Sequence, residues 1–339
     1  MSVHESEIAI IVPYFQREPG LLRQCVQSVL DTRGRVSVRI LVVDDGSPLP
    51  ATEEIGDLQD GYTVRIIPQE NAGPAAARNT GLDHVGDTPF VTFLDSDDQW
   101  TGSFLQDAVR ALEQGYDLFI GDSQRGRVPG TRFHWGRSDA ENIQLGQHRQ
   151  IQSEYDLYEF VGDFFDLVVR RSNVIGPNTM AYRVDRFPDV RFPENLIQGE
   201  DRLFKLRLGQ NRPHVAFSPR VYAEEGEGVN IFDKSGWNTE GYLGLMANYV
   251  TLAHMILDEI PLNARQRAFV RGQLGKSRRG FLAGVLHQVR HRKPLDWSVV
   301  AKTFRNDPVG ALLVGPNVLR LTADLLTNRG GARRARKSR

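Results

Sequence analysis

The 339-residue chain has a single cysteine, Cys25, and no long hydrophobic run. One cysteine excludes an internal disulfide framework and is typical of a reducing compartment. The apolar runs fall short of the roughly 18 residues that a membrane span needs. The first residues, MSVHESEIAIIVP, lack the basic start of a secretion signal. We therefore expect a cytoplasmic protein.

The chain also lacks net charge, since 42 basic residues balance 42 acidic ones. A neutral chain has no overall field that favours nucleic acid. The last eleven residues, RGGARRARKSR, nevertheless hold six basic side chains and no acid. Together with the apolar stretch before it, this tail predicts peripheral contact with an anionic membrane, at the inner face of the cell membrane. A packing helix followed by a solvated tail is the alternative.

Motifs for several other activities are missing. No G-x-G-x-x-G follows an apolar run, which argues against a nicotinamide-dependent dehydrogenase. The stretch GQLGKS has Val270 where a P-loop requires glycine, and HQVRH, with His287 and His291, lacks the glutamate of a zinc protease. The segment PYFQREPG is a poor match to the glycine-rich basic loop of a nucleotidyltransferase.

The first 125 residues alternate continuous apolar runs with amphipathic stretches. Ile8–Phe15 is apolar throughout, as in a strand covered on both faces, and Leu21, Cys25 and Val29 lie on one helical stripe. Further strands are predicted over 38–47, 62–69, 89–98 and 116–123, and helices over 73–85 and 101–114. This alternation predicts an α/β fold with a doubly wound, mostly parallel sheet.

The regular alternation is lost after Gln124. Residues 125–150 predict a loop or an irregular hairpin, and residues 153–172 a helix. Further on we expect a short helix from Glu200, a strand over 214–224 and, from Thr239, helices broken at Pro261, Pro294 and Pro308. The predicted organisation is a domain over 1–225, a mainly helical region over 226–328 and a disordered basic tail over 329–339.

Acidic residues cluster where two predicted strands end. Asp44 and Asp45 end the second strand, and Asp95, Asp97 and Asp98 follow the fourth. Ligands of open parallel sheets bind beyond the carboxyl ends of the strands, so the clusters share a crevice if their strands are neighbours. Crowded carboxylates need a cation, and Mg²⁺ or Mn²⁺ is held by one or two of them plus substrate phosphates. Capping of turns and helices is the alternative, above all for Asp98.

Five motifs stand in the order found in family 2 glycosyltransferases of the GT-A fold: IIVPYFQRE, LVVDDGS, NAGPAAARNTG, FLDSDD and QGEDRLFKLRL. The chain resembles this family over Ile8–Arg207. The segment Gly226–Gly241 is similar to sugar transferases of bacterial exopolysaccharide assembly, of the succinoglycan type. The resemblance implies a Rossmann-like nucleotide-sugar domain that uses Mg²⁺ or Mn²⁺.

The resemblance also implies a set of residues that contact the nucleotide-sugar: Pro13, Tyr14, Asp44, Asp45, Arg78, Asn79, Asp95 and Ser96. Within this set, Pro13 and Tyr14 form the turn after the first strand and lie against the nucleotide. Asp44 and Asp45 meet the uracil and the ribose, and Arg78 and Asn79 line the same pocket.

The metal site that the resemblance implies is a D-x-D pair. Asp97 binds the cation, and Asp95 binds the ribose or the cation. Many relatives add a late histidine, but here His214 sits inside a strand-like run. Glu225, Asn230 or water is left to complete the shell.

Glu200 and Asp201 match the Glu-Asp motif of the family, in which the aspartate is the catalytic base. An acceptor hydroxyl is a poor nucleophile, so a carboxylate must take its proton in the transition state. Complementing the helix dipole is the alternative for this pair. Trp237 suits stacking on an acceptor sugar, or else it is a core tryptophan.

Residues and resemblance together predict a metal-dependent, inverting glycosyltransferase. It moves a hexose, glucose, from a UDP-sugar to a hydroxyl of a lipid-linked glycan acceptor in bacterial exopolysaccharide or surface polysaccharide synthesis. The alternative is a non-catalytic sugar-nucleotide binding or scaffold protein of the same fold, which would keep the nucleotide pocket and lose the base. A nucleic-acid partner is not expected, because no basic face interleaved with aromatics is present.

Overall fold

The computed structural model describes residues 7–126, 128–136, 141–196, 198–226, 236–237, 239 and 241–316. The chain divides into two compact units. The first unit comprises residues 1–195 and 200–229, and the second comprises residues 196–199 and 230–339.

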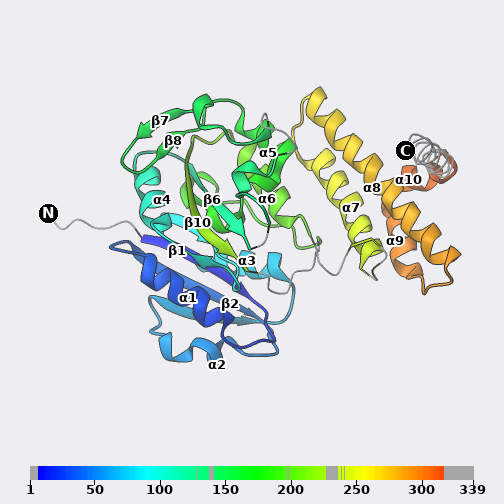
Figure 1. Cartoon of the computed structure of the whole chain (residues 1–339). Helices are drawn as coiled ribbons and strands as arrows, with labels where there is room; N and C mark the ends of the chain where they lie inside the picture. The colour runs from blue at the N-terminus through cyan, green and yellow to red at the C-terminus, as the bar shows by residue number, and fades with distance from the viewer. Residues whose placement is uncertain are drawn as a thin grey trace, which may run out of the picture. The chain divides into compact units, whose positions relative to one another are not determined.

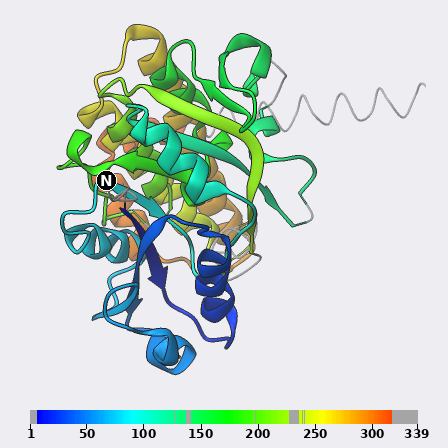
Figure 2. The ribbon, with the colours of Figure 1, turned by 90° about the vertical axis from the view of Figure 1, so that its left-hand side faces the viewer.

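The first unit is built on a ten-stranded mixed sheet (Figures 1 and 2). Its strands are β1 Glu7–Tyr14, β2 Ser37–Asp45, β3 Val64–Gln69, β4 Phe90–Phe93, β5 Gln99–Trp100, β6 Leu118–Arg125, β7 Arg149–Gln152, β8 Leu157–Glu159, β9 Met180–Arg183 and β10 Val215–Glu225. The order is β3-β2-β1-β4-β9-β6-β10-β8-β7, with β5 paired to β10. Strands β3, β2, β1, β4, β6 and β10 run in one direction, and β9 runs against its neighbours β4 and β6.

Among the described residues, six α-helices accompany this sheet: α1 Leu21–Thr32, α2 Ala51–Ile55, α3 Pro74–Asp83, α4 Phe104–Glu113, α5 Phe164–Arg171 and α6 Glu200–Gly209. The short 3₁₀ turns of the same unit are η1 Gly56–Leu58, η2 Arg132–His134, η4 Leu145–Gln147, η5 Ser172–Val174, η6 Pro177–Thr179 and η7 Val184–Arg186. Every residue of β1 after Glu7 is buried, as expected for a strand covered on both faces. Gly81 of α3 lies against Ile11 of β1, where a larger residue would clash. This close approach sets α3 directly on the sheet.

The predicted doubly wound, mostly parallel sheet is confirmed, with three differences. Strand β1 lies between β2 and β4, so the two strands that end in acids are not neighbours. Strand β9 was not predicted. The helix expected over 153–172 is wrong in its first half, because β8 pairs there with β7 and β10 and buries Leu157. Only α5, whose N-cap Asp163 accepts from the Asp166 amide, is helical in that stretch.

The second unit is helical, as predicted from Thr239 onward. Its helices are α7 Tyr242–Glu259, α8 Ala264–Arg290, α9 Trp297–Asn306 and α10 Pro308–Leu312. Their starts follow from local capping: Asn263 forms a capping box with Gln266, and Asp296 and Asp307 cap α9 and α10. The three prolines lie between or at the start of these helices, where a missing N–H costs least.

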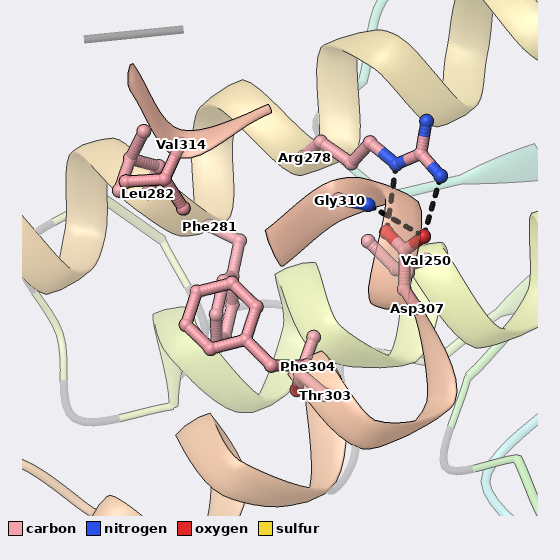
Figure 3. Close-up of a pocket in the computed structure, with 9 residues that line it drawn as sticks. All are labelled: Val250, Arg278, Phe281, Leu282, Thr303, Phe304, Asp307, Gly310 and Val314. Carbon is pink, nitrogen blue, oxygen red and sulfur yellow. Dashed lines mark hydrogen bonds and ion pairs between the residues drawn. The ribbon is translucent and has the colours of Figure 1, made fainter. Parts of the chain in front are cut away.

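A small cavity lies among the helices of this second unit (Figure 3). Its volume is about 10 Å³, room for about one water molecule. At its edge Asp307 accepts hydrogen bonds from the Arg278 guanidinium and from the Gly310 amide (Figure 3). We interpret this cavity as a packing defect beside a structural ion pair. No helix in the described part of the chain is long and apolar enough to cross a membrane.

Candidate active site

The acids predicted to contact the donor lie at the carboxyl edge of the sheet. Asp44 and Asp45 end β2, and residues 95–98 follow β4. Strand β1 has β2 and β3 on one side and β4 on the other, so the order of the strands reverses there. Ligands of open α/β sheets bind at such a reversal.

Both carboxylates at the end of β2 accept hydrogen bonds from backbone amides. Asp44 accepts hydrogen bonds from the amides of Ser47 and Ala51, each at 2.8 Å. Asp45 accepts from the amides of residues 72 and 73, also at 2.8 Å, and thereby shapes the loop before α3. The side chain of Asp44 therefore holds the first residue of α2, and that of Asp45 holds the loop before α3.

Arg78 of α3 joins the two acidic motifs that follow β4 and begin α6. Its side chain is 6% exposed, and its guanidinium donates to Asp95 Oδ1 at 2.6 Å and to Glu200 Oε1 at 3.1 Å. It also lies 5.3 Å from the centroid of the Phe192 ring. Arg78 and Glu200, 122 residues apart in sequence, thus meet, and the D-x-D and Glu-Asp motifs belong to one site.

The three acids of DSDD have different surroundings. Asp98 is buried and accepts hydrogen bonds from Asn178 Nδ2 at 2.7 Å and from the Gly226 amide at 2.8 Å. Its role is therefore structural. Burial, and then the charge of Asp95, raises the pKa of Asp97 to about 6. Gly226 lies directly against the Asp97 backbone, where a Cβ would clash. Asp97 and Asp95 are thus the two acids of this group that suit a cation.

The chemistry of these two carboxylates fits a divalent cation that is completed by substrate oxygens or water. Within the described ranges, no three or more His, Cys, Asp or Glu side chains are grouped as metal ligands. Glu225 is held by Arg132 through both oxygens and by Ser123 Oγ at 2.7 Å. His214 is exposed at the start of β10, away from that strand's carboxyl end. Asn230 lies outside the described residues.

Asp201 is the second residue of α6, as the sequence predicted. Its Oδ2 accepts from Lys205 Nζ at 2.9 Å, and its side chain is 34% exposed. Burial alone would raise the pKa of Asp201, but the charges of Lys205, Arg132 and Arg78 outweigh it and lower the pKa. This carboxylate is therefore ionised and partly open to solvent.

Other predicted donor residues lie differently from the expectation. Pro13 and Tyr14 do not form a turn: they are the last two residues of β1, paired with Val43 and Asp44. Tyr14 is 1% exposed, and its burial raises its pKa to about 12. The turn was wrong because the apolar run continues into the buried edge of the sheet.

Asn79 and Ser96 are also buried. Asn79 exchanges two hydrogen bonds with the Phe192 backbone, at 2.9 and 2.8 Å, and holds the segment that leads to α6. Ser96 Oγ accepts from Gln16 Nε2 at 3.3 Å. Both side chains therefore make structural hydrogen bonds near the acids.

Two basic residues near the site were missed from the sequence. Lys205 follows Asp201 by four residues, a spacing that puts both on one helix face and could have been noticed. Arg132 sits in the irregular stretch after β6, and its partner Glu225 is 93 residues further on. No local pattern reports such a contact.

Trp237 belongs to the second unit. Its side chain is 55% exposed and its ring packs against Tyr242 and His287, with centroids 5.0 and 5.3 Å away. A core position for this tryptophan is therefore wrong.

Comparison with known proteins adds to this geometry. Residues 9–174 match the family model of glycosyl transferase family 2. The chain is 28% identical over 314 residues to the succinoglycan biosynthesis protein ExoW of Rhizobium meliloti (strain 1021), covering 89% of this chain and 95% of that one. It is 34% identical over 253 residues to the minor teichoic acid biosynthesis protein GgaA of Bacillus subtilis (strain 168), covering 72% of this chain and 53% of that one.

Solved structures share the fold. A crystal structure of S. aureus TarS superposes with a TM-score of 0.52 at 19% identity, over 83% of this chain and 71% of that one. TarS in complex with UDP-GlcNAc gives a TM-score of 0.51 at 18% identity, over 83% and 72%. The predicted GT-A fold is thereby confirmed. These similarities together indicate a glycosyltransferase whose residues 9–174 match glycosyl transferase family 2.

Proposed function

We propose that the chain transfers a hexose, glucose, from a UDP-sugar to a hydroxyl of a lipid-linked glycan in bacterial exopolysaccharide or surface polysaccharide synthesis, with inversion and with Mg²⁺ or Mn²⁺. The observation that carries this proposal is the bridge of Arg78 between Asp95 and Glu200. It puts a carboxylate suited to the donor side and the start of α6, with Asp201, in one site. The names of the succinoglycan biosynthesis protein ExoW and the minor teichoic acid biosynthesis protein GgaA support the substrate class.

In this mechanism Asp201 is the base. Its ionised carboxylate accepts the proton of the acceptor hydroxyl as that oxygen bonds to the anomeric carbon. The bond from this carbon to the donor phosphate breaks, and UDP leaves with the electron pair. Because the attack and the departure are on opposite faces, the configuration inverts. One base suffices, and no covalent intermediate is required.

On the donor side, Asp97 and Asp95 would hold the cation. When bound, the cation neutralises the charge that develops on the leaving diphosphate. Arg78 orients Asp95 through its 2.6 Å hydrogen bond. Asp44 and Asp45 position the loops around the uracil and the ribose, and the solved TarS complexes with UDP and UDP-GlcNAc support a uridine donor.

Calorimetric titration of UDP and then UDP-glucose, with and without Mn²⁺, tests the donor site. Wild-type protein should bind both more tightly with the metal. Asp97→Ala should lose this metal dependence, because it removes the carboxylate proposed to carry the cation. Asp185→Ala is the matched control, since Asp185 pairs with Arg183 on the surface. A wild-type protein that binds no uridine nucleotide under either condition would contradict the donor assignment.

A non-catalytic binding or scaffold protein would also bind UDP. It would not need an ionised carboxylate at the start of α6, and Asp201 supplies one. Turnover of the wild-type protein therefore separates the two functions.

For the acceptor side, we propose that residues 1–225 form the nucleotide-sugar and catalytic domain and residues 226–328 the acceptor side, including Trp237. Residues 264–316 hold eleven Lys and Arg but only two acids, Asp296 and Asp307, and both acids cap helices. Large apolar side chains are exposed on the same helices, with Trp297 at 67% and Leu312 at 82%. This combination suits peripheral contact with an anionic membrane, at its cytoplasmic face, where a lipid-linked acceptor would lie.

Removing residues 329–339, with their six basic side chains, should weaken binding to vesicles that contain phosphatidylglycerol, since each basic residue near such a surface contributes about 1 kcal/mol. Co-sedimentation measures this effect. Vesicles of phosphatidylcholine alone and buffer at high salt are the controls, and both should abolish the difference. Equal binding by the full and shortened chains defeats the role of the tail.

A further inference from the structure

Lys205 is a buried cation that the proposed mechanism leaves unused. Its side chain is 2% exposed. Nζ donates to Asp201 Oδ2 at 2.9 Å and to the carbonyl oxygens of Ser172 and Ile175 at 2.9 and 2.8 Å. A charged ammonium has three N–H donors and a neutral amine only two. Three acceptors around one nitrogen therefore match the charged form.

The carbonyls that bind Lys205 belong to a segment that a further hydrogen bond holds in place. Ser172 begins η5, and Ile175 follows its last residue. The carbonyl oxygen of Asn173, between them, accepts from Arg132 Nη1 at 3.1 Å. Lys205 is thus fixed against backbone on one side, and its third hydrogen bond fixes Asp201.

We propose that Lys205 is the positioning residue of the base: it holds Oδ2 of Asp201, so that Oδ1 faces the acceptor hydroxyl, and it keeps the carboxylate ionised. This inference rests on the proposed function, in which Asp201 takes the acceptor proton. When one oxygen of a carboxylate is held, the direction of the other oxygen is fixed. Misplacement of that catalytic oxygen by about 1 Å can cost roughly 10²-fold in rate.

The other charged groups around Asp201 are engaged elsewhere. Glu200, its neighbour on α6, accepts from Arg78 of α3, which also binds Asp95. Arg132 of η2 pairs with Glu225. Both arginines lower the pKa of Asp201 by their charge, but Lys205 is the cation whose hydrogen bond to Asp201 the structure describes.

The test follows UDP release from UDP-glucose with Mn²⁺ against pH, for wild type, Lys205→Met, Lys205→Gln and Lys205→Arg. Without the ammonium, the pKa of Asp201 rises, because burial is no longer opposed by a bonded cation. In the Met and Gln variants, the acidic limb of the plot of kcat/KM against pH should therefore move to higher pH. The value of kcat/KM at the pH optimum should fall by up to about 10²-fold. Lys205→Arg keeps the charge and should keep the position of the limb.

Arg207→Met is the matched control, since Arg207 lies on the same helix and donates to the Arg191 carbonyl at 2.7 Å. It should leave the limb unchanged. If Lys205→Met does not fold, Lys205→Gln, whose amide can still donate to the carbonyls, carries the same expectation. UDP binding by each variant establishes that the donor site is intact.

The outcomes separate this inference from the proposed function. Full turnover by Asp201→Asn overturns the base and the inference with it. If Asp201→Asn is inactive but Lys205→Met and Lys205→Gln keep the wild-type acidic limb, only the role of Lys205 is overturned.

Discussion

Asp201→Asn is expected to bind UDP-sugar normally and to transfer the sugar roughly 10²–10⁴-fold more slowly, the usual loss for removal of a general base. The amide keeps the size of the side chain and the contact with Lys205, but it cannot take the acceptor proton. The readouts are single-turnover transfer, or UDP release with water as acceptor, beside calorimetric donor affinity.

Asp166→Asn provides a control of the same chemistry away from the site, because Asp166 pairs with Arg170 on α5. It should be fully active. Near-normal turnover by Asp201→Asn would show that another group takes the proton.

Arg78→Met is expected to lower the free energy of unfolding by about 3 kcal/mol, toward the lower end of the cost of breaking a buried ion pair. The change leaves Asp95 and Glu200 without their shared cation. Asp95 is 36% exposed, so water relieves part of the penalty there, whereas Glu200 is 13% exposed. Urea denaturation measures the loss.

The stability deficit of Arg78→Met should shrink as the pH falls. Burial raises the pKa of Glu200, and loss of Arg78 raises it further. A carboxyl whose folded-state pKa exceeds its unfolded value favours the folded state when protonated, so acid restores stability. Adding Glu200→Gln should recover part of the loss at neutral pH.

Arg183→Met, which breaks an exposed pair with Asp185, is the control and should cost under about 1 kcal/mol of stability. An equal cost for Arg78→Met and Arg183→Met would refute the bridge.

The parallel half of the fold could be predicted because its strands carry their own signal. A run such as 8–14 is apolar at nearly every position, and its helix neighbours show a 3.6-residue stripe. Strand β9 carries no such signal: it is four residues long, and it is defined by pairing with β4 and β6. Pairing between distant segments is a tertiary property.

The residue types of the candidate site could be predicted from the sequence, but the contacts between them could be predicted only in part. The acids of DSDD and the Glu-Asp pair were recognisable as residue types at strand and helix ends. That Asp98 supports Asn178 and Gly226, while Asp97 remains the more suitable metal ligand, depends on contacts 80 and 128 residues away. The sequence suggested capping for Asp98, but it could not show which residues Asp98 contacts.

The position of β9 has a consequence for the order in which the protein folds during synthesis. Strands β1 to β4 are neighbours made early, and they can pair as soon as they leave the ribosome. β6 is made after the two-residue β5, but it has no partner among β1 to β4, because β9 stands between β4 and β6. Until the chain has been made as far as Arg183, one edge of β4 and both edges of β6 are open. Unpaired strand edges are templates for wrong pairing. Between the emergence of β6 and that of β9, the nascent chain is therefore exposed to wrong pairing at these edges.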